Sequence, residues 1–171
     1  IMLGGVIVNV ILGIVIYAGI LFTWGNEYIP TEGLKYGVYA DSVAVNMGLK
    51  SGDKILAVDG EKIEKFSDIQ MNILINNAKQ VTIERNQKQE DITLPDGTIS
   101  GLIKNQKSFL EPAIIAEVKE VTPNTPADSA GLLPKDIILG IDNSSTPFFQ
   151  DVISYLKERP NESVILKVNR N

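Results

Sequence analysis

The sequence predicts an α+β protein in which one N-terminal membrane-spanning helix precedes two copies of a small module of short strands and one main helix. Two observations carry this prediction. Residues 1–24 contain no Asp, Glu, Lys or Arg, and the rest of the chain matches itself without a gap when Asp41 is laid over Asn124. A repeat of this length indicates one supersecondary unit used twice.

Residues 1–25 are predicted to form a transmembrane helix. At a rise of about 1.5 Å per residue, such a helix measures roughly 36 Å, against a hydrocarbon core of about 30 Å. Trp24 and Tyr28 stand where aromatic side chains gather at a membrane interface. A secretory signal would have a basic start, a shorter apolar core and a small-residue cleavage site, and the sequence shows none of these.

Each copy of the repeat is predicted to contain an apolar strand, a turn, a helix and a further strand. In the first copy the strand Lys54–Val58 ends at Asp59-Gly60, a hairpin signal. A helix follows with its apolar stripe at Phe66, Ile69 and Ile73, begun by a capping box of Ser67 and Gln70. Strands are predicted at residues 81–85 and 91–94.

The second copy is predicted to reach the same structure with other residues. Thr146 and Pro147 predict a helix that begins at the proline, and the strand at residues 164–168 places Val164 over Val81. The chain ends at Asn171, before the counterpart of residues 91–94. We therefore expect the sequence to be an internal piece of a longer protein.

The predicted domains follow from these patterns. They are a transmembrane helix at residues 1–25, a first module at 30–95, a linker rich in Gly, Ser, Asn and Lys at 96–110, and a second module at 111–171 that lacks its last strand.

Composition excludes several kinds of chemistry for this segment. The 171 residues include no His and no Cys, so neither a Ser-His-Asp triad nor a zinc site of the usual nitrogen and sulfur ligands can form. The net charge is −5 and the 16 basic residues are scattered, which argues against nucleic-acid binding. We predict no catalytic residue and no bound metal in this segment. Asp53 and Asp136 are interpreted as turn-stabilising carboxylates.

Residues 48–60, GLKSGDKILAVDG, resemble the most recognisable stretch of a bacterial PDZ domain. Residues 130–142, AGLLPKDIILGID, are a looser version in which Lys135 and Asn143 replace Gly52 and Gly60. The resemblance implies two PDZ-like domains, each a small β-barrel or sandwich with one main helix.

A membrane span followed by two PDZ-like domains resembles the site-2 protease family of zinc intramembrane metalloproteases, of the regulator of sigma-E protease type. In that family the second membrane helix begins with Gly-Pro-x-x-Asn. Gly5 and Asn9 match this motif, and Val6 replaces the proline. The resemblance implies a parent zinc metalloendopeptidase whose His-Glu-x-x-His motif and third zinc ligand lie outside this sequence. Asn9 would either handle substrate or bond a neighbouring helix.

The resemblance also implies a function in regulated intramembrane proteolysis. The PDZ pair would admit only membrane proteins that another protease has already clipped, such as anti-sigma factors. The protein would lie in the inner membrane with both PDZ domains periplasmic, and its partners would be the membrane and either a transmembrane substrate or peptide C-termini. Two alternatives are a noncatalytic membrane-anchored PDZ scaffold and a trypsin-like serine protease with tandem PDZ domains, in which a catalytic domain normally separates anchor and PDZ pair.

PDZ domains bind extended peptides by adding them to a sheet edge, with the terminal carboxylate held by backbone amides. By resemblance, the grooves would run along residues 34–39 opposite 67–74, and along 113–118 opposite 150–157. The carboxylate loop is matched in part by Gly33-Leu34 in the first copy and poorly by residues 111–113 in the second, where Pro112 lacks an amide donor and Glu111 would repel an anion. We therefore expect weak binding, above all in the second copy. The candidate groove residues are Gly33, Leu34, Lys35, Tyr36, Gly37, Val38, Ile69, Ile73, Ala113, Ile114, Ile115, Val152 and Leu156.

Overall fold

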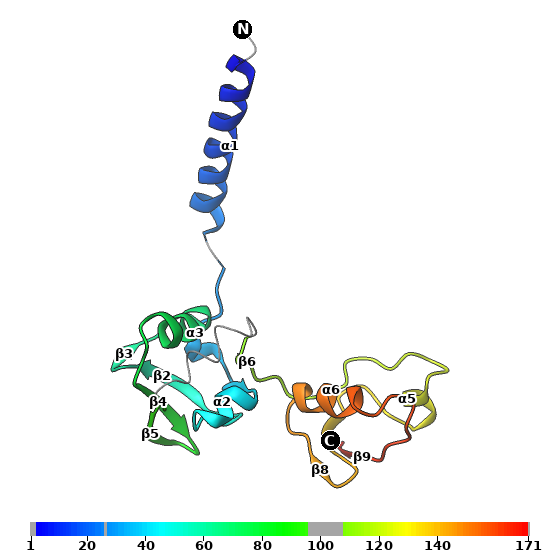
Figure 1. The fold of residues 1–171 in the computed structure, drawn as a ribbon. Helices are drawn as coiled ribbons and strands as arrows, with labels where there is room; N and C mark the ends of the chain where they lie inside the picture. Colours follow the sequence, from blue (N-terminus) through cyan, green and yellow to red (C-terminus); the bar gives the residue numbers. More distant parts are fainter. Residues whose placement is uncertain (1–2, 26, 96–107, 171) are drawn as a thin grey trace.

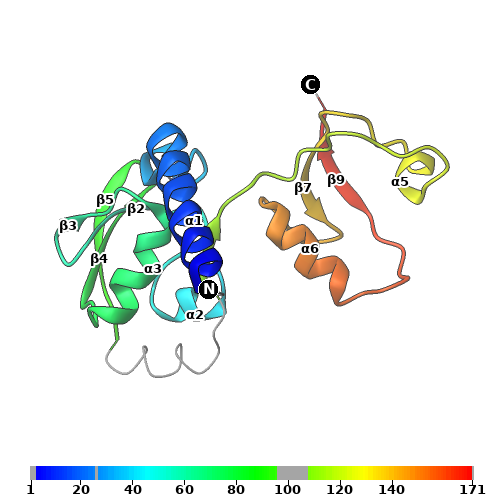
Figure 2. The same cartoon turned by 90° about the horizontal axis from the view of Figure 1, so that it is seen from above.

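The computed structural model describes residues 3–25, 27–95 and 108–170. A single long helix, α1 (Leu3–Trp24), projects away from two small modules that lie side by side (Figures 1 and 2). Each module combines short strands with one main helix. The predicted α+β architecture is therefore confirmed.

Helix α1 contains only uncharged residues, and its 21-residue apolar stretch Gly4–Trp24 is long enough to cross a membrane. None of this stretch is buried by the rest of the described chain. Exposed apolar side chains along a whole helix are costly in water and favourable in hydrocarbon. The helix fits a membrane protein.

The first module contains a four-stranded antiparallel sheet and a separate strand pair. The sheet has the order β3-β2-β4-β5 and the pair is β1-β6. The elements are η1 (Thr31–Gly33), β1 (Val38–Ala40), α2 (Ser42–Asn46), β2 (Lys54–Val58), β3 (Glu61–Lys62), α3 (Phe66–Ile75), β4 (Gln80–Arg85), β5 (Lys88–Thr93) and β6 (Leu110–Pro112). The predicted hairpin at Asp59-Gly60 is present, since Val58 pairs with Glu61 and both turn residues have positive φ.

Helix α3 places Ile69 and Ile73 at the centre of the first core, where both are fully buried. Phe109 and Leu110 pack into the same core. The structure differs here from the predicted linker at 96–110: residues 96–107 lie outside the described residues, but Phe109 and Leu110 are buried and β6 pairs with β1. The physical reason is that Phe109 and Leu110 are apolar and favour burial. The linker was predicted from the average composition of a mostly polar stretch, in which two apolar residues carry little weight.

The predicted capping box of α3 is wrong. The residue before the helix is Lys65, whose side chain makes no capping bond, and Ser67 donates to Asp68. Gln70 instead reaches across to the segment at β6. Buried backbone groups there need partners, and this requirement outweighs a local cap.

The second module has a three-stranded sheet of order β8-β7-β9. Its elements are α5 (Pro126–Ser129), β7 (Ile137–Ile141), β8 (Ser144–Ser145), α6 (Phe149–Lys157) and β9 (Leu166–Asn169). Helix α6 begins after Phe148, later than predicted, because Thr146 still belongs to the strand region: its N–H donates to the carbonyl of Leu139.

The repeat loses register in its last strand. Val81 pairs with Val58, and the equivalent partner of Ile141 is Leu166, not Val164. The connection between α6 and β9 is thus longer by two residues than its counterpart in the first module. A shift of two preserves which face of a strand each side chain occupies, so the ungapped sequence match hides it.

Candidate functional site

A buried carboxylate organises the turn that leads into β2. The Asp53 side chain is 1% exposed and accepts the Lys50 N–H at 2.7 Å. Arg85, from the end of β4, donates from Nε and Nη2 to the two carboxylate oxygens, each at 2.7 Å. Its Nη2 also donates to the carbonyl of Gly48. This two-pronged contact, the turn clamp, fixes the turn to the sheet.

The second module contains the same clamp. Asp136 is 1% exposed and accepts the Leu133 N–H at 2.8 Å. Arg170 donates from Nε and Nη2 to its two oxygens at 2.7 and 2.6 Å, and to the carbonyl of Gly131. Sequence analysis missed Arg170 because the shifted strand places it, and not Val168, at the position of Arg85. Both aspartates act as structural groups, as interpreted from the sequence.

Acid is expected to loosen the second module at a defined pH. The Arg170 guanidinium, helped by the Leu133 amide, lowers the pKa of Asp136 from 3.8 to about 2. Because the folded state favours the ionised carboxylate, this stabilisation is present above pH 4 and is lost as the pH falls toward 2. In NMR spectra recorded from pH 5 to 2, the amide chemical shift of Gly131 should change with the ionisation of Asp136. The Asp136→Asn variant should show no such transition. A transition that persists in that variant contradicts the assignment.

The strand predicted to receive a peptide in the first module is already paired on both sides. Val38 exchanges bonds with Gly52 and Asp53 on one side, and β1 pairs with β6 on the other. A Cβ on Gly37 would lie 2.3 Å from the carbonyl oxygen of Asp53, so the backbone at Gly37 packs directly against the turn before β2. The structure therefore differs from the predicted groove along residues 34–39.

The remaining candidates of the first module are scattered. Gly33 ends η1, Leu34 is buried, and Lys35 lies over the ring of Tyr36 with Nζ 5.0 Å from its centroid. Ile69 and Ile73 belong to the core. The edge that faces α3 is that of β6, a strand that begins at Leu110, the last residue of the predicted linker.

The outer edge of β6 is closed by side-chain amides and a proline. The Phe109 carbonyl accepts the Asp41 N–H, Glu111 pairs with Tyr39, and the Ala113 N–H donates to the Gly37 carbonyl, which turns Leu110 and Pro112 outward. Gln70 of α3 donates from Nε2 to the Leu110 carbonyl at 3.2 Å and accepts the Phe109 N–H at 3.0 Å. Gln150 of α6 donates to the Pro112 carbonyl at 2.7 Å. Pro112 itself offers no N–H.

In the second module the candidates lie around the start of α6. The Ile114 carbonyl accepts the Phe149 N–H at 2.7 Å, and Ile115 forms a bridge with Phe148. Ala113 and Val152 are buried. The predicted strand edge at residues 113–118 is therefore engaged within the chain: Ala113 bonds Gly37 of the first module, and Val118 bonds Lys135 and Asp136 of its own.

An open apolar hollow of about 810 Å³ lies on the other side of α6. It is lined by residues whose counterparts form the core of the first module. Leu156 is 42% exposed where Ile73 is fully buried. A Cβ on Gly131 would meet no atom of the described residues within 4 Å, whereas one on Gly48 would lie 3.1 Å from the Ile92 side chain of β5. The remaining lining includes Leu132, Ile138, Val152, Leu166 and Val168.

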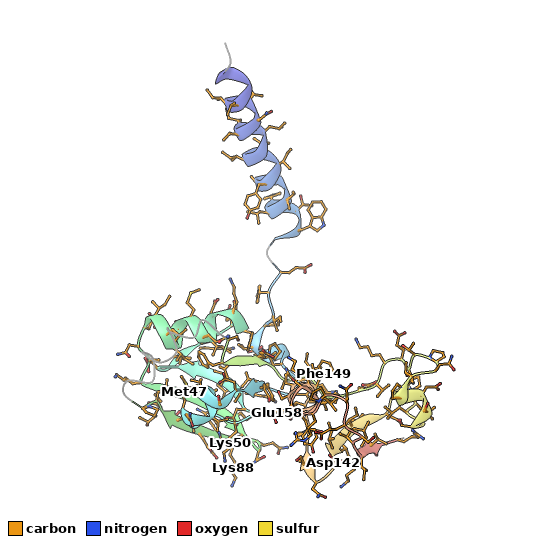
Figure 3. All side chains as sticks on the ribbon, turned by 45° about the vertical axis from the view of Figure 1, so that its right-hand side comes forward. Met47, Lys50, Lys88, Asp142, Phe149 and Glu158 are labelled. Carbon is orange, nitrogen blue, oxygen red and sulfur yellow. The ribbon has the colours of Figure 1, made fainter. Side chains whose placement is uncertain are left out.

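The two modules touch where α6 begins. The rings of Tyr39 and Phe148 meet edge to face with centroids 6.4 Å apart. Burial raises the pKa of the Tyr39 hydroxyl, and the Asp151 carboxylate adds to the rise. Figure 3 shows Phe149 at this junction, with Lys50 and Lys88 on the first module and Asp142 and Glu158 on the second. Helix α6 thus packs against the β1-β6 pair.

No group of three or more His, Cys, Asp or Glu side chains in residues 3–25, 27–95 and 108–170 could hold a metal ion. Gly5 and Asn9 lie one turn apart on the exposed surface of α1. Residues four apart share a helix face, so both can meet the same neighbouring helix.

The family profile of the PDZ domain matches this chain twice, at residues 36–84 and 117–170. The chain belongs to the PDZ domain family. The matched segments contain both main helices and both clamp aspartates, and the second also contains Arg170, whereas Arg85 directly follows the first. The resemblance inferred from residues 48–60 and 130–142 is confirmed.

Curated relatives extend the likeness beyond the PDZ modules. A Treponema pallidum protein named as a zinc metalloprotease is 29% identical over 178 residues, covering 98% of this chain and 38% of the relative. A Rickettsia conorii protein named as a zinc metalloprotease is 34% identical over 87 residues, covering 51% and 24%. A Haemophilus influenzae protein named as a periplasmic serine protease is 28% identical over 149 residues, covering 78% and 32%. The chain spans a quarter to two fifths of these relatives.

Proposed function

We propose that this chain is the second membrane helix and PDZ tandem of a site-2-type zinc intramembrane protease. The observation that carries the proposal is the Treponema pallidum match, whose 98% coverage runs through α1 and both PDZ modules. The parent would bind zinc through residues outside this chain and hydrolyse a peptide bond within a transmembrane segment. Gly5 and Asn9 would lie on the helix beside the active site.

The short connection between α1 and the first module supports the zinc type over the serine type. Only residues 25–29 separate the end of α1 from the bridge that Pro30 makes with Lys65. A trypsin-like catalytic domain does not fit into that interval. A noncatalytic membrane-anchored scaffold is the other alternative, and the enzymatic test below separates the two.

The proposed role of the tandem is a filter for substrates. Both predicted peptide edges are engaged within the chain, which suits steric exclusion better than tight capture of C-termini. The PDZ modules would stand over the membrane on the periplasmic face and admit only substrates already shortened by another protease. Anti-sigma factors and similar clipped membrane proteins are the substrate class.

Purified parent protein tests the proposal directly. We expect it to contain zinc and to cleave a single-span membrane protein whose periplasmic domain has been clipped, with activity lost on chelation and restored by zinc. Parent protein that is pure, folded and inactive toward such substrates would favour the scaffold.

The membrane orientation is tested on spheroplasts. Protease added from outside should digest the PDZ region, whereas protection of that region would place it in the cytoplasm.

A further inference from the structure

We propose that Gln70 and Gln150 are gate residues that close the peptide-binding edge of the first PDZ module, and that this edge opens only when the two modules part. The identity of the ligand rests on the proposed function: it would be an extended segment of a membrane-protein substrate. It assigns the control of that edge to two amide side chains on different modules.

The amide of Gln70 takes the place of a ligand backbone. A strand added to an edge accepts one N–H and donates to one C=O at each outward-facing position. Gln70 makes one bond of each kind, at two neighbouring residues: its Oε1 accepts the Phe109 N–H at 3.0 Å, and its Nε2 donates to the carbonyl of the outward-facing Leu110 at 3.2 Å. Ser108 Oγ also bonds the amide, which holds Gln70 in this position.

Gln150 closes the next outward-facing position from the other module. Its Nε2 donates to the Pro112 carbonyl at 2.7 Å, and the missing N–H of Pro112 removes the alternative donor. Gln150 Oε1 is buried and has no partner in the described part of the chain. An amide bonded at one end only is displaced more easily than one bonded at both ends.

The junction ties this second closure to the arrangement of the modules. Gln150 sits in the first turn of α6, beside Phe148, whose ring meets Tyr39 of β1. The Phe149 N–H fixes the same turn to Ile114, directly after β6. A strand that pairs with Pro112 must therefore move the start of α6 away from the first module. Binding at this edge and separation of the modules are linked.

The experiment uses the 171-residue chain in detergent micelles with a fluorescent heptapeptide of Thr, Val and Ala that has a free C-terminal Val. We expect Gln70→Ala and Gln150→Ala each to tighten binding about tenfold. The first frees the Phe109 N–H and leaves the Leu110 carbonyl with Ser108 as its donor, and the second frees the Pro112 carbonyl. Gln89→Ala, an exposed glutamine on β5, is the matched control and should change nothing. A peptide N-methylated at alternate residues should gain no affinity, because it cannot pair.

Separation of the modules is measured in the same samples. The chain has no cysteine, so Lys88→Cys and Glu158→Cys carry two spin labels, one on each module (Figure 3). The peptide should lengthen the distance between them. Unchanged affinity in folded Gln70→Ala and Gln150→Ala chains, or tighter binding at an unchanged distance, overturns the proposal.

Should Gln70→Ala fail to fold, Gln70→Glu serves instead. It keeps the acceptor for Phe109 but sets a carboxylate against the Leu110 carbonyl, and it should tighten peptide binding less than the alanine variant of Gln150. If a folded Gln70→Glu chain binds the peptide no more tightly than the unchanged chain, the proposal is also overturned. The proposed protease function stands or falls separately, because cleavage by the parent is measured without this peptide.

Discussion

Replacing Arg85 by alanine should destabilise the first PDZ module by about 3 kcal/mol, which lowers its melting temperature by on the order of 15 °C. The substitution leaves the Asp53 carboxylate 1% exposed without its cationic partner. It also removes a donor from the Gly48 carbonyl. The loss is followed module by module through the amide signals of Gly48 and Gly131 on heating.

The matched control is the exposed ion pair between Lys54 and Glu84, whose side chains are 46% and 38% exposed. Lys54→Ala should cost no more than about 0.5 kcal/mol, because solvent already screens the pair. If Arg85→Ala and Lys54→Ala prove equally mild, the turn clamp does not hold the module together. Melting of the second module should be unchanged in both variants.

Two lysines in α1 should detach the chain from the membrane. Leu12→Lys and Ile16→Lys lie on one helix face near its centre, and each charge costs about 3 kcal/mol at that depth on insertion scales. The doubly substituted chain should leave the membrane fraction on carbonate extraction. Leu12→Val with Ile16→Val, which keeps the apolar face, should remain. Retention of the lysine variant would show that the PDZ modules themselves anchor the chain.

The elements read from local patterns were predicted well. Strand Lys54–Val58 and the turn at Asp59-Gly60 form as predicted, because an apolar run closed by a residue pair suited to positive φ specifies a hairpin by itself. The apolar stripe of α3 correctly predicted a helix, but Ile69 and Ile73, named as groove candidates, prove to be buried in the core. Lys135 adopts the left-handed φ of 75° at the position of Gly52, so the looser copy keeps the turn despite the substitution.

Features that depend on contacts between distant residues were not predicted from the sequence. Arg170 replaces Arg85 in the second turn clamp only because β9 is displaced by two residues, and a shift of two leaves the apolar alternation unchanged. The strand β6 was hidden in a polar stretch, since three residues carry too little pattern to be recognised.

The peptide edge is the clearest case. Its location depends on the pairing of β1 with β6, which join residues far apart in the sequence. Gln70 carried a plausible local role as a cap, and only the fold shows that its amide bonds Phe109 and Leu110 instead. Side-chain amides suit both roles, so residue type alone could not choose between them.

In the proposed function, the PDZ tandem controls which membrane proteins reach the active site of a parent zinc protease. The most direct measurement compares cleavage of one single-span substrate, intact and clipped, by the purified parent protein with and without residues 30–170. We expect the whole parent to cleave only the clipped form, the shortened parent to cleave both forms, and chelation of zinc to stop all cleavage. If the whole and the shortened parent protein prefer the clipped substrate equally, the proposed role of the PDZ tandem is contradicted.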